Sequence, residues 1–160
     1  MPSHYSRTQI ALHWLIFLAI VVQFLFHETI SGVWRQMEQG GTPPFAPLAA
    51  LHVFLGLAIL ALVVWRLVLR LNRGAPPLPE KEPTLLKFVA HATHGLLYLL
   101  MLALPVTGAL AWFGGLSDLG EVHEALFQGI FILVILHILG VFYQQFVLKT
   151  NIIDRMKRAG

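Results

Sequence analysis

The chain has 160 residues, of which 57% are hydrophobic and only 12% are charged, and its formal net charge is +3. Soluble domains carry about 25% charged residues, so this composition excludes an ordinary soluble protein and indicates a membrane protein. The chain has no cysteine, which excludes disulfides, thiolate-bound iron–sulfur clusters and c-type haem attachment.

The first half of the chain contains two apolar runs, each about as long as the 20 or so residues that a helix needs to cross a bilayer. The first run covers 8–27. The Gly- and Pro-rich stretch 28–46 that follows is predicted to be an irregular loop with a short interfacial helix at Val33–Met37. The second run covers 47–69, and a Pro-rich linker over 73–83 follows it.

The second half contains two more apolar runs. The third covers 88–113 and includes Pro105, where we expect a kink. A short Gly-rich turn leads to the fourth run, over 122–148. Short connections favour antiparallel neighbours. The sequence therefore predicts an all-α fold, an integral membrane four-helix bundle that forms a single domain over residues 1–160.

Basic residues gather on one side of the predicted membrane. Lys and Arg that flank a span stay in the cytoplasm, and all basic residues except Arg35 fall on the side of the termini. The opposite side holds Arg35 and the carboxylates Glu28, Glu38, Asp118, Glu121 and Glu124. We therefore expect both termini in the cytoplasm. The positive net charge reflects this orientation and does not indicate a nucleic-acid partner.

Histidines are the unusual feature of the apolar runs. Six of them lie inside a run or at its first turn: His13, His52, His91, His94, His123 and His137. Ionisable side chains at membrane depth are costly and usually serve function. A role as interhelical hydrogen-bond partners would be filled as well by Ser or Asn, so the histidines favour a functional role.

The spacing of two histidines indicates haem. His123 and His137 are 14 residues apart, which on an α-helix places them ~40° apart around the axis and ~21 Å apart along it. This arrangement suits two stacked haems, each held by histidines from facing helices. Met101 is the only methionine in the middle of a span, which favours bis-histidine ligation. The helix directions pair His13 with His137 at an inner haem.

Two residues, His52 and His27, are candidates for the partner of His123 at the outer haem. His52 begins the second run, and Gly56 on the same face leaves room for a flat porphyrin. His27 ends its run beside Glu28, where an interfacial histidine is ordinary. Geometry permits either residue, and these features favour His52.

Several motifs, in order, resemble the bacterial cytochrome b-561 family over nearly the whole chain: YSRTQIALHW, ALHVFLG, VVWRLVLRL, VAHATHGLLYLLMLALPVTG and HEA…LHILG. The resemblance implies a di-haem bundle of the bacterial inner membrane with two haem b groups. It assigns the axial ligands to the four positions His13, His52, His123 and His137. It also implies electron transfer between the extracytoplasmic side and the quinone pool, with membrane lipid, quinone and a periplasmic redox protein as partners.

Two further groups of side chains lie near the predicted inner haem. His91 and His94 are three residues apart at the start of the third run, and we expect them to contact a haem propionate or quinone. Arg66 and Arg70 are one helical turn apart. They either bind haem propionates or extend to lipid phosphate, and the sequence favours neither role.

Three other functions compete with electron transfer. A proton or metal-ion transporter is disfavoured because the interiors of the four runs lack the Asp or Glu that pumps need. The resemblance also includes anchor subunits of larger redox enzymes and superoxide oxidases, which pass electrons from superoxide to ubiquinone. Asp118, Glu121 and Glu124 around His123 would repel an anion such as superoxide, so we expect a cationic or neutral donor.

Overall fold

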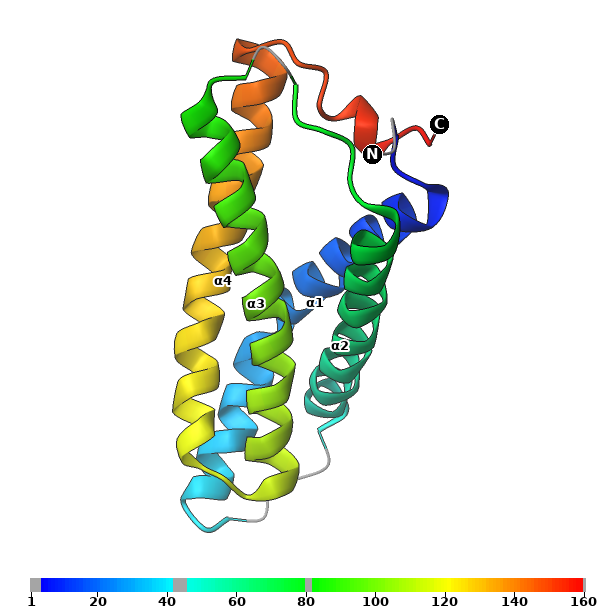
Figure 1. The fold of residues 1–160 in the computed structure, drawn as a ribbon. Helices are drawn as coiled ribbons and strands as arrows, with labels where there is room; N and C mark the ends of the chain where they lie inside the picture. Colours follow the sequence, from blue (N-terminus) through cyan, green and yellow to red (C-terminus); the bar gives the residue numbers. More distant parts are fainter. Residues whose placement is uncertain (1–3, 42–45, 80–81, 160) are drawn as a thin grey trace.

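The computed structural model describes residues 4–41, 46–79 and 82–159, and within these ranges every regular element is helical. The four long helices are α1 (Arg7–Glu38), α2 (Pro47–Arg73), α3 (Thr84–Gly114) and α4 (Asp118–Phe142). They form an elongated bundle (Figure 1). Each is long and apolar enough to cross a membrane, with a mean hydropathy of 2.0 to 2.5 in its most apolar window. The predicted all-α four-helix membrane bundle is therefore confirmed.

Helix α1 is longer than predicted. It continues to Glu38, so the prediction of an irregular loop was wrong for residues 28–38, and Val33–Met37 is part of α1. A single glycine such as Gly32 costs a helix only about 1 kcal/mol, and α1 ends just before two consecutive glycines. The rest of the predicted loop includes residues 42–45, which lie outside the described residues.

The ends of the other helices follow from local sequence. Pro47 occupies the first turn of α2, where its missing N–H costs nothing. Helix α3 ends at Gly114 and is capped by Gly115, whose φ of 67° lies in the left-handed region that glycine adopts without strain. Helix α4 continues as a π-helix over Tyr143–Val147, so this helix ends one residue before the predicted end of the fourth run, and a short 3-10 helix follows at Asp154–Met156.

The helices pack in chain order, α1 on α2, α2 on α3 and α3 on α4. Phe24 closes the bundle by placing α1 against α4, where its ring centre lies 5.0 Å from that of Phe127. A cluster of buried side chains lies between α1 and α2 and consists of Ile16, Ala19, Ile59 and Val63. Many other apolar side chains of the four helices are exposed, as expected for surfaces that face lipid.

Both termini lie at one end of the bundle (Figure 1). We call this the inner end, and the end with the α1–α2 and α3–α4 connections the outer end. The C-terminal segment is fixed there because the Trp14 indole donates to the Met156 carbonyl at 2.7 Å. Arg155 also donates to the Pro77 carbonyl in the α2–α3 linker, again at 2.7 Å.

Candidate functional site

The structure brings four of the predicted histidines together as two pairs. The inner pair is His13 on α1 and His137 on α4, with ring centres 6.3 Å apart and ring planes at 67°. The outer pair is His52 on α2 and His123 on α4, with ring centres 6.2 Å apart and ring planes at 75°. Since the two α4 members are separated by ~21 Å along the helix, the pairs lie near opposite ends of the bundle.

The ring spacing of both pairs fits an iron between two axial imidazoles. A metal–imidazole nitrogen bond is about 2.0–2.1 Å long and the ring centre lies about 1.1 Å beyond that nitrogen, so two imidazoles on opposite sides of one metal have ring centres roughly 6.3 Å apart. Both observed separations agree with this requirement. The histidine pairs therefore fit bis-histidine haem b.

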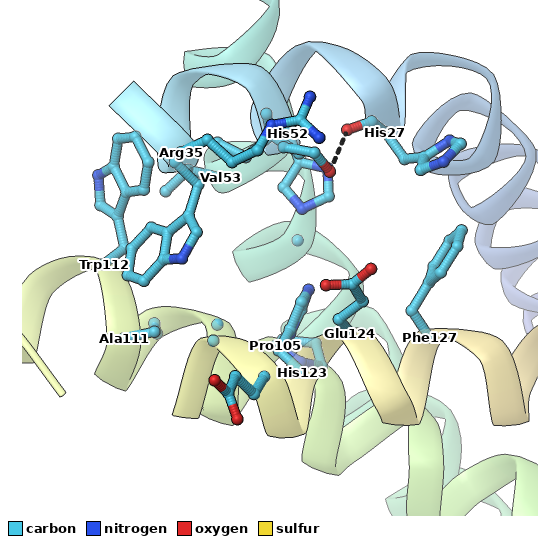
Figure 2. Close-up of a pocket in the computed structure, with 18 of the residues that line it drawn as sticks. His27, Arg35, His52, Val53, Pro105, Ala111, Trp112, His123, Glu124 and Phe127 are labelled. Atoms are coloured by element: carbon cyan, nitrogen blue, oxygen red, sulfur yellow. Dashed lines mark hydrogen bonds between the residues drawn. The ribbon is translucent and has the colours of Figure 1, made fainter. Parts of the chain in front are cut away.

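A cavity of about 510 Å³ surrounds the outer pair. His52 and His123 face one another across it (Figure 2). Gly56, which the sequence singled out as leaving room for a porphyrin, is among its lining residues. The cavity is therefore placed to accept a large flat group between the two imidazoles.

Helix α3 fixes the orientation of the His123 ring. Nδ1 of His123 donates to the Leu104 carbonyl at 2.8 Å, which leaves Nε2 with its lone pair free to bind a metal. Gly108 lies against the same ring, where a Cβ atom would come within 2.9 Å of Cε1. These contacts were not predicted from the sequence, although Pro105 inside an apolar run, with Gly108 three residues later, is a signal of close packing.

His27 occupies the edge of the same cavity and does not face His123 in the way that His52 does. Its ring stacks on Phe127, with ring centres 5.1 Å apart and planes at 25°. Its Nε2 lies 3.3 Å from a carboxylate oxygen of Glu28. The structure thus brings His52, and not His27, opposite His123.

A third imidazole lies beside the inner pair. The ring centre of His94 is 5.2 Å from that of His137, and its Nδ1 donates to the Ala90 carbonyl at 2.6 Å. His91, one turn earlier on α3, is exposed. The structure therefore separates two histidines that the sequence treated together, because only His94 points toward the inner pair.

Arg66 and Arg70 both engage protein groups at the inner end. The Arg66 guanidinium donates to the Gln9 carbonyl on α1, and it lies close enough to His13 to interact with it electrostatically. The Arg70 guanidinium lies 5.9 Å from the centre of the Tyr98 ring, a cation–π distance. Arg66 is thus the arginine associated with the inner pair.

Carboxylates dominate the charge around the outer cavity. Its lining contains the carboxylates Glu28, Glu38, Glu121 and Glu124. Arg35 also lines it and is the cation among these lining residues, and Figure 2 shows Arg35 and Glu124 approaching the cavity from different helices. Asp118, which the sequence placed with the acidic residues around His123, does not line the cavity.

Comparison with known proteins gives a consistent result. The family model described as prokaryotic cytochrome b561 matches residues 4–159. Cytochrome b562 of Cereibacter sphaeroides is 35% identical over 154 residues, which cover 96% of this chain and 95% of the relative. A probable superoxide oxidase, CybB of Yersinia pestis, is 29% identical over 180 aligned positions that cover 98% of this chain and 97% of the relative.

These matches agree with the four apolar helices and the histidine pairs in indicating a membrane cytochrome. The chain is a multi-pass protein of the bacterial inner membrane and a b-type cytochrome that takes part in electron transfer. It belongs to the prokaryotic cytochrome b561 family.

Proposed function

We propose that this chain, a single membrane domain over residues 1–160, binds two haem b groups and carries electrons between the extracytoplasmic side and the quinone pool. The observation that carries the proposal is the presence of two histidine pairs of equal spacing, 6.3 Å and 6.2 Å, at opposite ends of the bundle. A single pair would serve one side of a membrane, whereas two pairs along α4 serve both sides.

Each histidine has a definite role in this proposal. His13 and His137 bind the inner iron, and His52 and His123 bind the outer iron. Haem b, when bound at both sites, supplies the one-electron oxidation and reduction that the side chains themselves lack.

The inner end carries the groups suited to anionic and hydrogen-bonding partners. Because Nδ1 of His94 donates to the Ala90 carbonyl, its Nε2 can accept a hydrogen bond from the hydroxyl of a reduced quinone, or donate to a haem propionate or a quinone oxygen when the ring is protonated. Arg66 is placed to neutralise a propionate near the inner pair. Arg70 lies over Tyr98 and close enough to His94 to interact with it electrostatically, and the exposed His91 lies outside the site.

The distribution of charge supports a cytoplasmic location for the inner end. Arg7, Arg73 and Lys87, at the inner ends of α1, α2 and α3, and the basic residues after α4 fall there, as the positive-inside rule requires of cytoplasmic segments. The outer cavity then opens on the extracytoplasmic side. Its acidic lining favours a cationic periplasmic redox protein as electron donor, since opposite charge accelerates encounter.

A superoxide:ubiquinone oxidoreductase is the alternative function. It is supported by the similarity to the probable superoxide oxidase of Yersinia pestis and by the position of Arg35 in the outer cavity. Four carboxylates line the same cavity, and they oppose the approach of an anion. The charge at the entrance therefore favours the cationic donor.

Haem content tests the proposal directly. The purified protein should contain two haem b per chain, measured by the pyridine haemochrome spectrum against protein concentration. A potentiometric titration should resolve two one-electron components. One haem per chain, or none, would overturn the proposal.

A further inference from the structure

The two imidazoles of the outer pair differ in the hydrogen bonds made by their Nδ1 atoms. Nδ1 of His123 donates to the Leu104 carbonyl at 2.8 Å, and the Thr107 hydroxyl oxygen lies 3.3 Å from the same nitrogen. Nδ1 of His52 is buried and has no hydrogen-bond partner among the described residues. One ligand of the pair is therefore polarised by the protein and the other is not.

The contact with His123 depends on a specific backbone arrangement of α3. Thr107 Oγ1 lies 3.0 Å from the Leu104 carbonyl oxygen and 2.9 Å from that of Ala103, and it donates its single hydrogen to these carbonyls. A Cβ at Gly108 would lie 2.9 Å from Cε1 and 3.0 Å from Nδ1 of the His123 ring. The ring can therefore rest on the Leu104 carbonyl only while residue 108 is glycine.

Such a contact changes the chemistry of a ligating histidine. An N–H group that donates to a carbonyl makes the opposite nitrogen of the ring a stronger electron donor. A stronger donor stabilises the more positive, ferric state, and second-shell hydrogen bonds are among the means by which proteins set haem potentials. This effect lowers the reduction potential of the iron that His123 binds.

We propose that segment 104–108 of α3 sets the reduction potential of the outer haem through His123. Thr107 and Gly108 are positioning residues in this proposal, because they control how closely Nδ1 approaches the Leu104 carbonyl. The inference rests on the proposed function, since it takes His123 as an axial ligand. The inner haem serves as an internal reference, because its ligands lie at the other end of the bundle.

Gly108→Ala is the first test, with Gly95→Ala as the matched control on the same helix. A Cβ at Gly95 meets nothing within 4 Å, so that control keeps both haems and both potentials. Gly108→Ala should move the ring off the carbonyl and raise the outer potential. We expect the ratio of ferric to ferrous haem at fixed ambient potential to fall about tenfold, equivalent to about 59 mV for one electron.

A second variant keeps the test valid if Gly108→Ala cannot hold the outer haem. Thr107→Val removes the hydroxyl that shares the Leu104 carbonyl without adding bulk near the ring, so His123 becomes the sole side-chain donor to it. The outer potential should then shift in the opposite direction, to a lower value, and Thr107→Ser should restore it. Low-temperature electron paramagnetic resonance should show matching changes in the outer ferric signal alone.

Failure of this inference is distinguishable from failure of the proposed function. If His123→Ala retains two haems per chain, the ligand assignment is wrong. If His123→Ala loses one haem, the ligand assignment stands. The inference is then overturned if the test variants, Gly108→Ala and Thr107→Val, leave the outer potential and its resonance signal unchanged wherever they still hold two haems.

Discussion

The inner and outer histidine pairs share one geometry and differ in everything around it. Their ring separations agree within 0.1 Å. The outer pair faces a cavity of about 510 Å³ with four carboxylates in its lining, whereas the inner pair has a third imidazole, His94, and the guanidinium of Arg66 close by. In the proposed function the spacing serves the iron, and the different surroundings serve a different redox partner at each end.

The difference predicts a direction for electron transfer. Negative charge stabilises the ferric state, and positive charge favours the ferrous state. The carboxylates and the Leu104 contact should therefore lower the outer potential, and Arg66 should raise the inner one. We expect electrons to pass from the outer to the inner end with a favourable free energy.

The largest expected effect is the loss of haem when a histidine of the outer pair is removed. His52→Ala and His123→Ala should each reduce haem content from two to one per chain, because an iron with one protein ligand is weakly held. His27→Ala is the control and should keep both haems, measured by the pyridine haemochrome spectrum. Loss of a haem from His27→Ala, with two retained in His52→Ala, would reverse the assignment of the outer pair.

The inner pair can be broken in the same way. His13→Ala and His137→Ala should each lose the same haem, identified as the higher-potential component of the titration. His91→Ala is the matched control, since its exposed side chain lies away from the pair. If the two ligand variants lose haems of different potential, the pairing of His13 with His137 is wrong.

The charge of the outer cavity should appear in donor kinetics. Haem reduction by superoxide should be slow, and reduction by a cationic protein donor should be fast and should weaken as salt screens the attraction. Combined Glu28→Gln and Glu121→Gln substitutions should slow the cationic donor severalfold at low salt, whereas Asp154→Asn at the inner end should not. Stopped-flow reduction by superoxide near the diffusion limit would favour the superoxide oxidase function instead.

The smallest expected effect concerns the inner arginines. Arg66→Gln removes a positive charge near His13 and His137, and such a charge favours the ferrous state of the inner iron. The inner potential should fall accordingly in a redox titration. Arg70→Gln should have a smaller effect, because that guanidinium lies over Tyr98. Equal shifts in both variants would contradict the separate roles given to the two arginines.

Much of this organisation was predictable from the sequence because membrane spans and buried histidines leave a strong local pattern. Hydropathy located the four helices, and the spacing of His123 and His137 along one helix predicted two sites. The end of α1 was not predictable in the same way, since a loop rich in glycine and proline begins with residues that a helix tolerates. Gly32 lies within α1, and the helix ends only near the consecutive glycines Gly40 and Gly41.

Details that depend on packing between helices could not be predicted. His27 and His52 are the same residue type at similar depth, and only the rotation of α1 and α2 decides which faces His123. The contact between Leu104 and His123 uses a backbone carbonyl, which every residue possesses, so the sequence signals close packing near Pro105 and does not show which carbonyl accepts. Gly108 marks it only once α3 and α4 are placed together.

The most direct test of a two-site path is electron transfer across a sealed bilayer. Proteoliposomes that contain quinone-free lipid and trapped ferricyanide would receive an impermeant reductant from outside, and absorbance would report reduction of the trapped ferricyanide. The proposed path predicts reduction by the unaltered protein, no reduction above the protein-free rate with His52→Ala or His13→Ala, and normal reduction with His27→Ala. Transfer that persists in a variant that has lost one haem, or no transfer by the unaltered protein with both haems bound, would contradict it.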